Sequence, residues 1–274
     1  MTNIKAAQWI GLVQDTILKE MRSKTLIFIF IATSLMIFLA HALLKMLMDN
    51  NDPASQLIIS GANSLSYMFR AINIWSVIIA GIFGISAVRS DFREKIIYQY
   101  LTFPISRTQY MFGRIFGAWF LVYGYYLYAY FLSALLFSVA TKSVVLQWNH
   151  LASMLLMGPY IFLVIFISFL YSLMAGKIGS FLLLFLTVFT ISVSSESMRY
   201  LETSDYFKNV GLFKSIGLIV YFFFPRINYI SEVANAIMFN EEIRLKLGLE
   251  AMHLIVTSLF FIFLADRLVR RKNF

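Results

Sequence analysis

Six long apolar runs restrict what this chain can fold into. They cover residues 25–47, 71–88, 115–140, 151–175, 178–195 and 251–266. About 20 consecutive apolar residues cross the hydrocarbon layer of a bilayer as an α-helix. Inside that layer, every backbone polar group must find its partner within the protein, which a helix achieves by itself. The sequence therefore predicts an all-α, polytopic membrane protein with six transmembrane helices.

The composition agrees with this class. Hydrophobic residues make up 60% of the chain and charged residues 14%, and the mean hydropathy is +0.76. A soluble domain is about 45–50% apolar and about 25% charged. It could not bury 28 Phe and 15 Tyr residues without leaving large apolar patches exposed. No internal repeat or linker interrupts the pattern, so we expect residues 1–274 to form a single transmembrane domain.

Basic residues predict the orientation. The net charge is +9, yet the outer loops 48–63 and 141–150 hold one basic residue, Lys142. Of the 23 Lys and Arg residues, 14 lie in the segments that are cytoplasmic when the N-terminus is inside, which agrees with the positive-inside rule. A seventh span would place the basic C-terminal sequence RLVRRKNF outside. We therefore expect both termini in the cytoplasm, and we interpret the charge as attraction to anionic lipid and not to nucleic acid.

The N-terminal segment 4–24 has the spacing of an amphipathic helix. Trp9, Val13, Ile17 and Met21 follow one another every four residues, and charged residues occupy other positions. Such a helix lies in the headgroup plane before the first span. A solvated cytoplasmic helix is the alternative.

The segment 196–250 becomes a long outer segment in a six-span topology. Within it, residues 210–224 are apolar but contain Lys214 and end at Pro225. Irregular backbone at membrane depth has to be covered by protein. We therefore expect re-entrant or interfacial helices between the fifth and sixth spans.

Small residues mark one face of the third span and its approach. Gly113, Gly117 and Gly124 fall on that face. Small residues let a second helix come close in a membrane protein. We interpret this face as a packing surface and assign it no chemistry.

Polar residues in the predicted spans are candidates for lining a transport pathway, because intramembrane polar and ionisable groups are costly unless they serve a function. The candidates are His41, Lys45, Arg70, Asn73, Ser180, Thr187, Thr190 and Ser194. Two alternatives stay open. Lysine and arginine near a span end can extend to the interface, and Ser or Thr can bond to the carbonyl four residues earlier.

Signatures of covalent chemistry are missing from the sequence. It has no cysteine, no G-x-x-x-x-G-K-[ST] phosphate loop and no H-E-x-x-H zinc motif. We expect no metal site, no cofactor bound by this chain and no intrinsic catalysis. One alternative is an ATPase-independent secondary transporter or channel, a class that usually shows repeats with broken helices. The other is an intramembrane lipid-modifying enzyme, for which the outer segment offers Glu196, Glu202, Asp205 and Glu232.

The inner loop between the second and third spans, RSDFREKIIYQYLTFPISRTQY (89–110), carries unusually patterned chemistry. It opens with a cluster of charges, continues with the apolar and aromatic run 96–103, and breaks at Pro104. Ser106 is placed to cap a new helix leading into the third span. Aromatic anchors flanked by charges suit docking to a soluble partner. The alternative is an interfacial helix that only returns the chain to the membrane.

The loop and the overall layout resemble the ABC-2 type permeases, the membrane subunits of one class of ATP-binding-cassette transporters. The matching residues are Asp91, the run Leu-Thr-Phe-Pro-Ile-Ser-Arg at 101–107, and Gly113-Arg114. The likeness is greatest to the short six-span permeases associated with nitrous-oxide-reductase maturation, gliding or drug export. Lys95-Ile96 stands where the family usually has Gly-Thr, and Arg93 replaces an acid.

This resemblance implies a permease subunit of an exporter, with 89–107 as the coupling helix that docks a separate ATPase. By resemblance, the docking residues are Asp91, Arg93, Glu94, Lys95, Tyr98, Leu101, Phe103, Pro104 and Arg107. The 4–24 helix would brace the ATPase, and 196–250 would form an outer gate.

The same resemblance implies the partners. Two ATPase subunits would bind ATP and Mg, and two permease copies would pair, most simply as a homodimer with the pathway between them. The complex would lie in the plasma membrane, in bacteria the cytoplasmic membrane, and an accessory protein could join it. The substrate is not indicated by the sequence.

Overall fold

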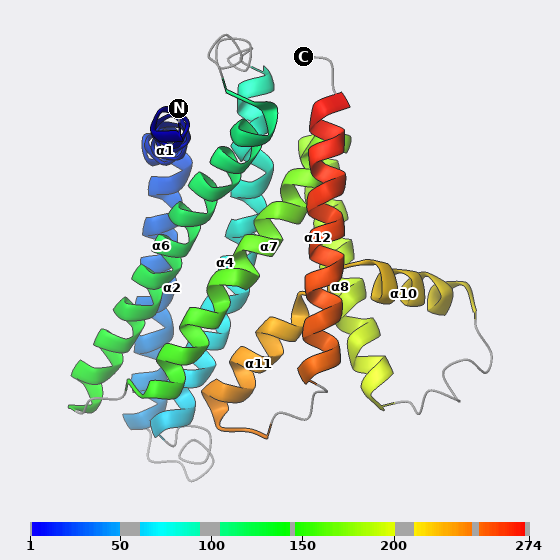
Figure 1. Ribbon diagram of the computed structural model, residues 1–274. Coiled ribbons are helices and arrows are strands. Elements are labelled where there is room, and N and C mark those ends of the chain that lie inside the picture. Colours follow the sequence, from blue (N-terminus) through cyan, green and yellow to red (C-terminus); the bar gives the residue numbers. More distant parts are fainter. Residues whose placement is uncertain are drawn as a thin grey trace.

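The computed structural model describes residues 2–49, 61–93, 105–142, 146–200, 211–242 and 247–271, and every regular element within these ranges is an α-helix. The helices are α1 (Thr2–Met21), α2 (Lys24–Asp49), α4 (Gly61–Arg93), α6 (Arg107–Thr141), α7 (Trp148–Met174), α8 (Lys177–Tyr200), α10 (Leu212–Phe223), α11 (Asn228–Phe239) and α12 (Leu247–Arg271). Figure 1 shows them as a bundle of long helices with α1 across one end.

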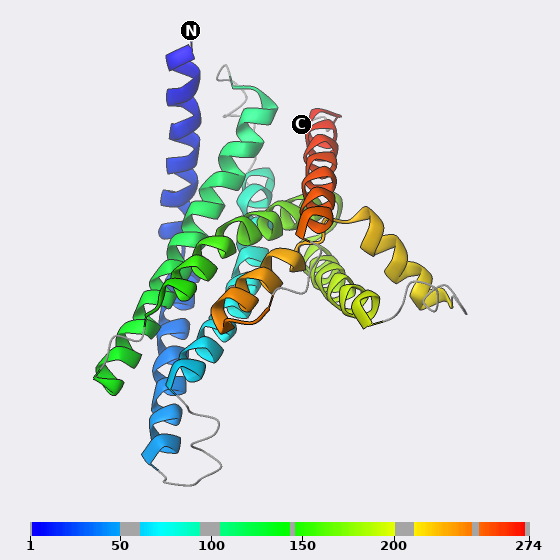
Figure 2. The same cartoon turned by 60° about the horizontal axis from the view of Figure 1, so that its bottom comes forward.

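Six of these helices, α2, α4, α6, α7, α8 and α12, are long and apolar enough to cross a membrane. This confirms the predicted all-α fold and its six candidate spans. The N-terminal helix α1 and the C-terminal end of α12 lie at the same end of the bundle in both views (Figures 1 and 2). An even number of spans requires this arrangement. We call this end the inner end, since the basic segments predicted to be cytoplasmic lie there.

The centre of the bundle is formed by α4 and α7, whose backbones approach closely. A Cβ atom at Gly84 would lie 2.7 Å from the carbonyl oxygen of Ile165, so only glycine permits this contact. The α7 residues Ile161 and Val164 are fully buried at this interface of the core. In contrast, α2 and α12 expose most of their apolar side chains, as expected for helices that face lipid.

The tyrosine-rich part of α6 is held by hydroxyl hydrogen bonds to three neighbouring helices. Tyr125 pairs with Thr33 of α2, and Tyr126 donates to Oδ1 of Asn73 on α4 over 2.9 Å. Tyr130 donates to the backbone carbonyl of His150 on α7 over 2.7 Å. Buried tyrosine is tolerated in an apolar core when its hydroxyl finds such a partner.

The α4 helix is longer than the predicted second span, 71–88. The candidate membrane span within it covers Leu65–Ala87, so its inner end agrees with the prediction, and the helix continues without a break to Arg93. At about 1.5 Å per residue it is about 50 Å long, more than the ~30 Å of a hydrocarbon core. Arg89 Nη1 donates to the carbonyl of Ala175 over 2.6 Å, which attaches the inner end of α4 to the turn between α7 and α8.

The third span begins as the sequence predicts. Ser106 Oγ accepts the backbone N–H of Gln109 over 3.1 Å, and Gln109 Oε1 accepts the backbone N–H of Ser106 over 3.0 Å. This reciprocal pair is a capping box, which satisfies two donors at a helix start. The α6 helix therefore begins at Arg107, directly after its predicted cap.

The outer segment contains a sharply bent helix pair. A bend of 79° separates α10 from α11, and Pro225 lies between them. Figure 1 shows α10 lying across the bundle axis near mid-height, while α11 runs from there toward the outer end. The bend is held by Arg226, whose Nη1 lies 2.8 Å from Glu250 Oε2 of α12 and whose guanidinium stacks 3.6 Å from the centre of the Tyr221 ring. A pair with this length, apolarity and bend is either a broken span or a re-entrant loop, of which the sequence predicts the second.

The topology can be tested with single cysteines, since the natural chain has none. We expect Arg22→Cys, in the exposed turn between α1 and α2, and Lys142→Cys, at the outer end of α6, to lie on opposite sides of the membrane. A membrane-impermeant maleimide should label only one of them in sealed cells and both after permeabilisation. Labelling of both positions in sealed cells would contradict the six-span arrangement.

Candidate functional site

A cluster of ion pairs joins three helices at the inner end of the bundle. Its centre is the carboxylate of Asp91, near the end of α4. Asp91 Oδ1 lies 2.7 Å from Lys19 Nζ of α1, and Oδ2 lies 2.6 Å from Arg114 Nη2 of α6. The hydroxyl of Tyr110, one turn before Arg114, donates to the same Oδ2. We call these four residues the Asp91 cluster.

Burial makes this cluster energetically important. The side chain of Asp91 is 0% exposed and that of Arg114 is 1% exposed. Arg114 Nη1 also donates to Thr16 Oγ1 over 2.9 Å and to Asp15 Oδ2 over 3.0 Å. A buried charge is tolerated only when it is paired and hydrogen-bonded. The buried charges of α4 and α6 therefore depend on each other, and Lys19 of α1 adds a second countercharge for Asp91.

Close packing of α1 on α6 brings the cluster together. A Cβ atom at Gly117 would lie 2.5 Å from Cβ of Thr16, and one at Gly113 would lie 3.0 Å from Cβ of Leu12. The predicted small-residue face is thus confirmed for these two glycines, whereas Gly124 has no neighbouring atom within 4 Å of such a Cβ.

The buried face of α1 differs from the predicted stripe. Leu12, Val13 and Thr16 are buried against the bundle, whereas Met21, the last residue of the predicted stripe, is 54% exposed. Trp9 packs edge-on against Phe116 of α6 at 5.6 Å. The difference arises because α6 offers a glycine-lined groove on one side, so α1 turns its small and polar residues toward α6.

The predicted docking residues do not share one environment. Asp91 is buried in the cluster, where it anchors the end of α4, and its role in docking stays a prediction. Arg107 Nη1 donates to the carbonyl of Arg270 over 2.8 Å, which ties the start of α6 to the end of α12. Arg93 is the last residue of α4. The remaining residues, Glu94, Lys95, Tyr98, Leu101, Phe103 and Pro104, lie outside the described residues, and their docking role stays a prediction.

Several predicted pathway residues make hydrogen bonds within the bundle. Ser180 Oγ donates to the Gly176 carbonyl over 2.8 Å, and Thr187 Oγ1 donates to the Leu183 carbonyl over 2.8 Å. Asn73 is 4% exposed and accepts from Tyr126. These contacts agree with the alternative that Ser and Thr bond back along their own helix.

The other predicted pathway residues lie in different places. His41 meets Phe137 edge-on, with ring centres 6.3 Å apart. Ser194 is buried and Thr190 is half-buried on α8, while the side chain of Lys45 lies outside the described residues. Arg70 is exposed and lines a cavity. The structure therefore does not bring the eight predicted residues together.

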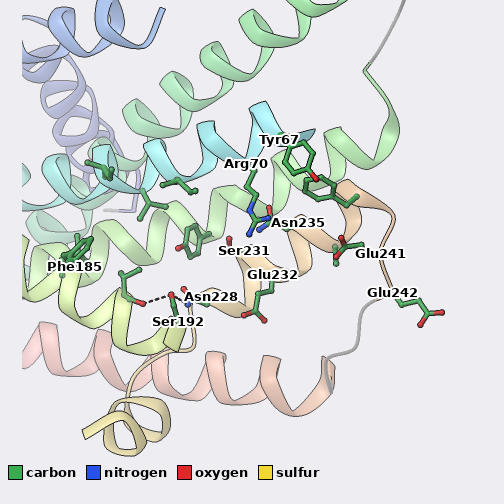
Figure 3. Close-up of a pocket in the computed structure, with 18 of the residues that line it drawn as sticks. Tyr67, Arg70, Phe185, Ser192, Asn228, Ser231, Glu232, Asn235, Glu241 and Glu242 are labelled. Carbon is green, nitrogen blue, oxygen red and sulfur yellow. Dashed lines mark hydrogen bonds between the residues drawn. The ribbon is translucent and has the colours of Figure 1, made fainter. Parts of the chain in front are cut away.

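The cavity of about 1330 Å³ lies between α4, α8 and α11 (Figure 3). Its polar walls include Tyr67, Arg70, Ser192, Asn228, Ser231 and Asn235, and Glu232, Glu241 and Glu242 also line it. Its apolar walls include Ile74, Val77, Ile78, Phe181, Leu184, Phe185 and Val188. This volume exceeds the roughly 300–1,000 Å³ of a site for a drug-sized molecule.

Apart from Glu232, sequence reasoning did not identify the α11 side of this cavity. Polar residues recur at helical spacing along one face of α11. They are Asn228, Ser231 with its neighbour Glu232, and Asn235. That spacing is a signal that could have been found. Asn228 Nδ2 donates to Ser192 Oγ and so joins α11 to α8. In the described part of the chain, no group of His, Asp or Glu residues is arranged to hold a metal ion.

The glycine contact predicts a position-specific effect on stability. Gly117→Ala should separate α1 from α6, because its Cβ would overlap Thr16, at a cost of about 1–3 kcal/mol. Gly124→Ala is the matched control on the same helix and should be neutral or stabilising by roughly 0.5–1 kcal/mol. Thermal unfolding of the purified protein in detergent measures both. Equal effects of the two substitutions would show that α1 does not pack on α6 in this way.

The Asp91 cluster predicts a difference between two aspartates that both contact Arg114. Asp91→Asn leaves Arg114 and Lys19 without their shared countercharge and should cost about 3–5 kcal/mol. Asp15→Asn removes a contact of a side chain that is 47% exposed and should cost less than about 1 kcal/mol. The melting temperature in detergent distinguishes them, and a small effect of Asp91→Asn would argue against a buried cluster.

Comparison with known families identifies this architecture. Residues 12–178 match the family described as ABC-2 family transporter protein. The matched range begins in α1, includes the whole Asp91 cluster and ends at the start of α8. No individual curated protein matches the chain. Because the match covers more than half of the residues, the chain belongs to the ABC-2 family of transporter proteins and is a multi-pass membrane permease of an ABC transporter.

Proposed function

We propose that this permease is driven by a separate ATPase subunit that docks on the inner loop between α4 and α6. The observation that carries the proposal is the Asp91 cluster, because it lies at the point where α4 leads into that loop. A force applied to the loop would act first on the end of α4. From there it would reach α1 and α6 through the two ion pairs of Asp91.

The inner end of α4 has a second attachment that extends this transmission. Arg89 binds the carbonyl of Ala175, in the turn between α7 and α8. The start of α6 is in turn tied to α12, since Thr108 Oγ1 donates to Asp266 Oδ1 over 2.5 Å and Arg107 bonds to Arg270. A displacement of the loop would thus reach every helix that these contacts connect, and the inner ends would move together.

Two permease copies would form the pathway, and the cavity between α4, α8 and α11 would be the contribution of one copy. The cavity supports this assignment because it combines polar and apolar walls and includes residues of the bent outer segment. The bend between α10 and α11 would let that segment act as the outer gate. ATP and Mg would be bound by two ATPase subunits in the cytoplasm. The complex would export its substrate across the plasma membrane.

One observation favours a second candidate, an ATPase-independent transporter. Broken helices are typical of secondary transporters, and α10 and α11 form a pair bent by 79°. Transport by the purified chain in liposomes, with no ATPase present, would support this candidate.

The docking proposal is tested with the affinity-tagged permease purified from its native host. We expect an ATP-hydrolysing subunit to copurify. Glu94→Lys, in the predicted docking loop, should lower the ATPase activity of the complex by roughly tenfold, because charge placed against a complementary surface governs docking. Lys142→Glu is the control, since it reverses a charge at the outer end of α6 and should leave the activity unchanged. Unchanged activity of Glu94→Lys, or a permease that purifies without an ATPase, would count against the proposal.

A further inference from the structure

The cavity between α4, α8 and α11 has a polar end and an apolar end. On α4, Tyr67 and Arg70 line the outer part, and Ile74, Val77 and Ile78 follow at helical spacing toward the middle of the span. At about 1.5 Å per residue, this wall extends about 16 Å. That is roughly half of the ~30 Å hydrocarbon core, or the depth of one lipid leaflet.

The α8 wall continues the apolar end. Phe181, Phe185 and Val188 face the cavity, and the polar side chain of Ser192 follows only near its outer part. Contact with such a wall would add no favourable binding free energy for a substrate that is polar throughout. An alkyl chain would gain about 25 cal/mol for each Å² of apolar surface removed from water.

Arg70 is the positive charge in this cavity wall. Within the described residues, its guanidinium forms no hydrogen bond or ion pair. Figure 3 shows its side chain directed from α4 toward α11, close to Asn235 and Ser231. Asn235 Oδ1 is buried without a hydrogen-bond partner among the described residues, and as an acceptor it could pair with a headgroup hydroxyl but not with the anion itself. An arginine with free donors is suited to bind a phosphate or carboxylate, which its planar fork can contact with two hydrogen bonds.

Three acidic residues line the cavity: Glu232 lies on α11 inside it, close to Ser231 and Asn228, and the other two indicate from which side the anion arrives. Glu241 and Glu242 follow the end of α11 at the outer mouth of the cavity, and both are exposed. Figure 3 shows Glu242 pointing away from the cavity body. Two carboxylates at the watery mouth repel a free anion in solution. An anion attached to a membrane-embedded tail would instead reach Arg70 from the lipid side.

We infer that this cavity binds an amphiphile with an anionic headgroup, whose phosphate or carboxylate pairs with Arg70 and whose alkyl tail lies between α4 and α8. The inference deepens the proposed function and rests on it, because it names the chemical class of molecule that the permease takes up. Arg70 sets the preference for an anion, and the apolar walls set the requirement for a tail.

The test uses the full-length permease in lipid nanodiscs and two photoreactive probes. Both probes carry a diazirine in an acyl chain, and they differ only in the headgroup: anionic phosphatidylglycerol in one and zwitterionic phosphatidylcholine in the other. We expect the phosphatidylglycerol probe to label the cavity walls near Phe185 and Val188, identified by mass spectrometry. Arg70→Gln should reduce this labelling by about tenfold, the loss expected for one charge-assisted contact. Arg70→Lys should retain most of it.

Lys142→Gln is the matched control, since it removes a positive charge on the same side of the membrane but outside the cavity. It should leave labelling unchanged. Equal labelling of the cavity by both probes, or no effect of Arg70→Gln, would overturn the inference and would mean that Arg70 only extends to the interface. Displacement of the probe by millimolar inorganic phosphate would also overturn it, because the site would then bind the anion without a tail.

The labelling assay needs neither ATP nor the ATPase subunit. ATP hydrolysis by the copurified complex is measured separately on the wild-type protein. If labelling fails while the complex still hydrolyses ATP, the inference that the cavity binds an anionic amphiphile is wrong and the proposed ATPase-driven function stands. If labelling depends on Arg70 but no ATPase copurifies, the binding site stands and the proposal that a separate ATPase subunit drives the permease is wrong.

Discussion

The buried carboxylate of Asp91 is the interaction on which the inner half of this protein depends. Its side chain is fully buried and lies within 2.7 Å of two cationic groups that come from different helices. Charges in such an environment are stable only as a complete set, because removing one partner leaves another charge buried without compensation. The positions of α1, α4 and α6 are therefore coupled, and α1 is part of the bundle.

The two ends of the bundle are held in different ways, and this difference suits a transporter. At the inner end, ion pairs and the Arg89 contact connect the helices that flank the predicted docking loop. Toward the outer end, α4, α8 and α11 diverge around a large cavity. The inner end, where force would enter, is tightly linked, and the outer end, where a substrate would bind, is open. Such a bundle can convert movement at the inner end into a change of access to the cavity at the outer end.

Much of the fold could be predicted because a membrane imposes simple rules. Length and apolarity identified the spans, charge asymmetry predicted the orientation, and local chemistry placed the cap at Ser106. The long-range contacts could not be predicted, since no local pattern indicates that Asp91 pairs with Lys19 of α1 and Arg114 of α6. The bonds of Ser180 and Thr187 to carbonyls four residues earlier are local, and they agree with the alternative that the sequence left open.

The sequence by itself determined the helices, their order and the family resemblance of the inner loop, and it predicts their direction across the membrane. These properties depend on composition, on local hydrogen bonding and on the cost of placing backbone and charge in lipid. Only the tertiary structure decided which polar groups meet: that Lys19, Asp91 and Arg114, far apart in the chain, share one buried site, and that Arg70 faces α11 across a cavity. The physical reason is that rotation of each helix about its axis is set by its neighbours, through close contacts such as those at Gly84 and Gly117, and no local pattern records that rotation.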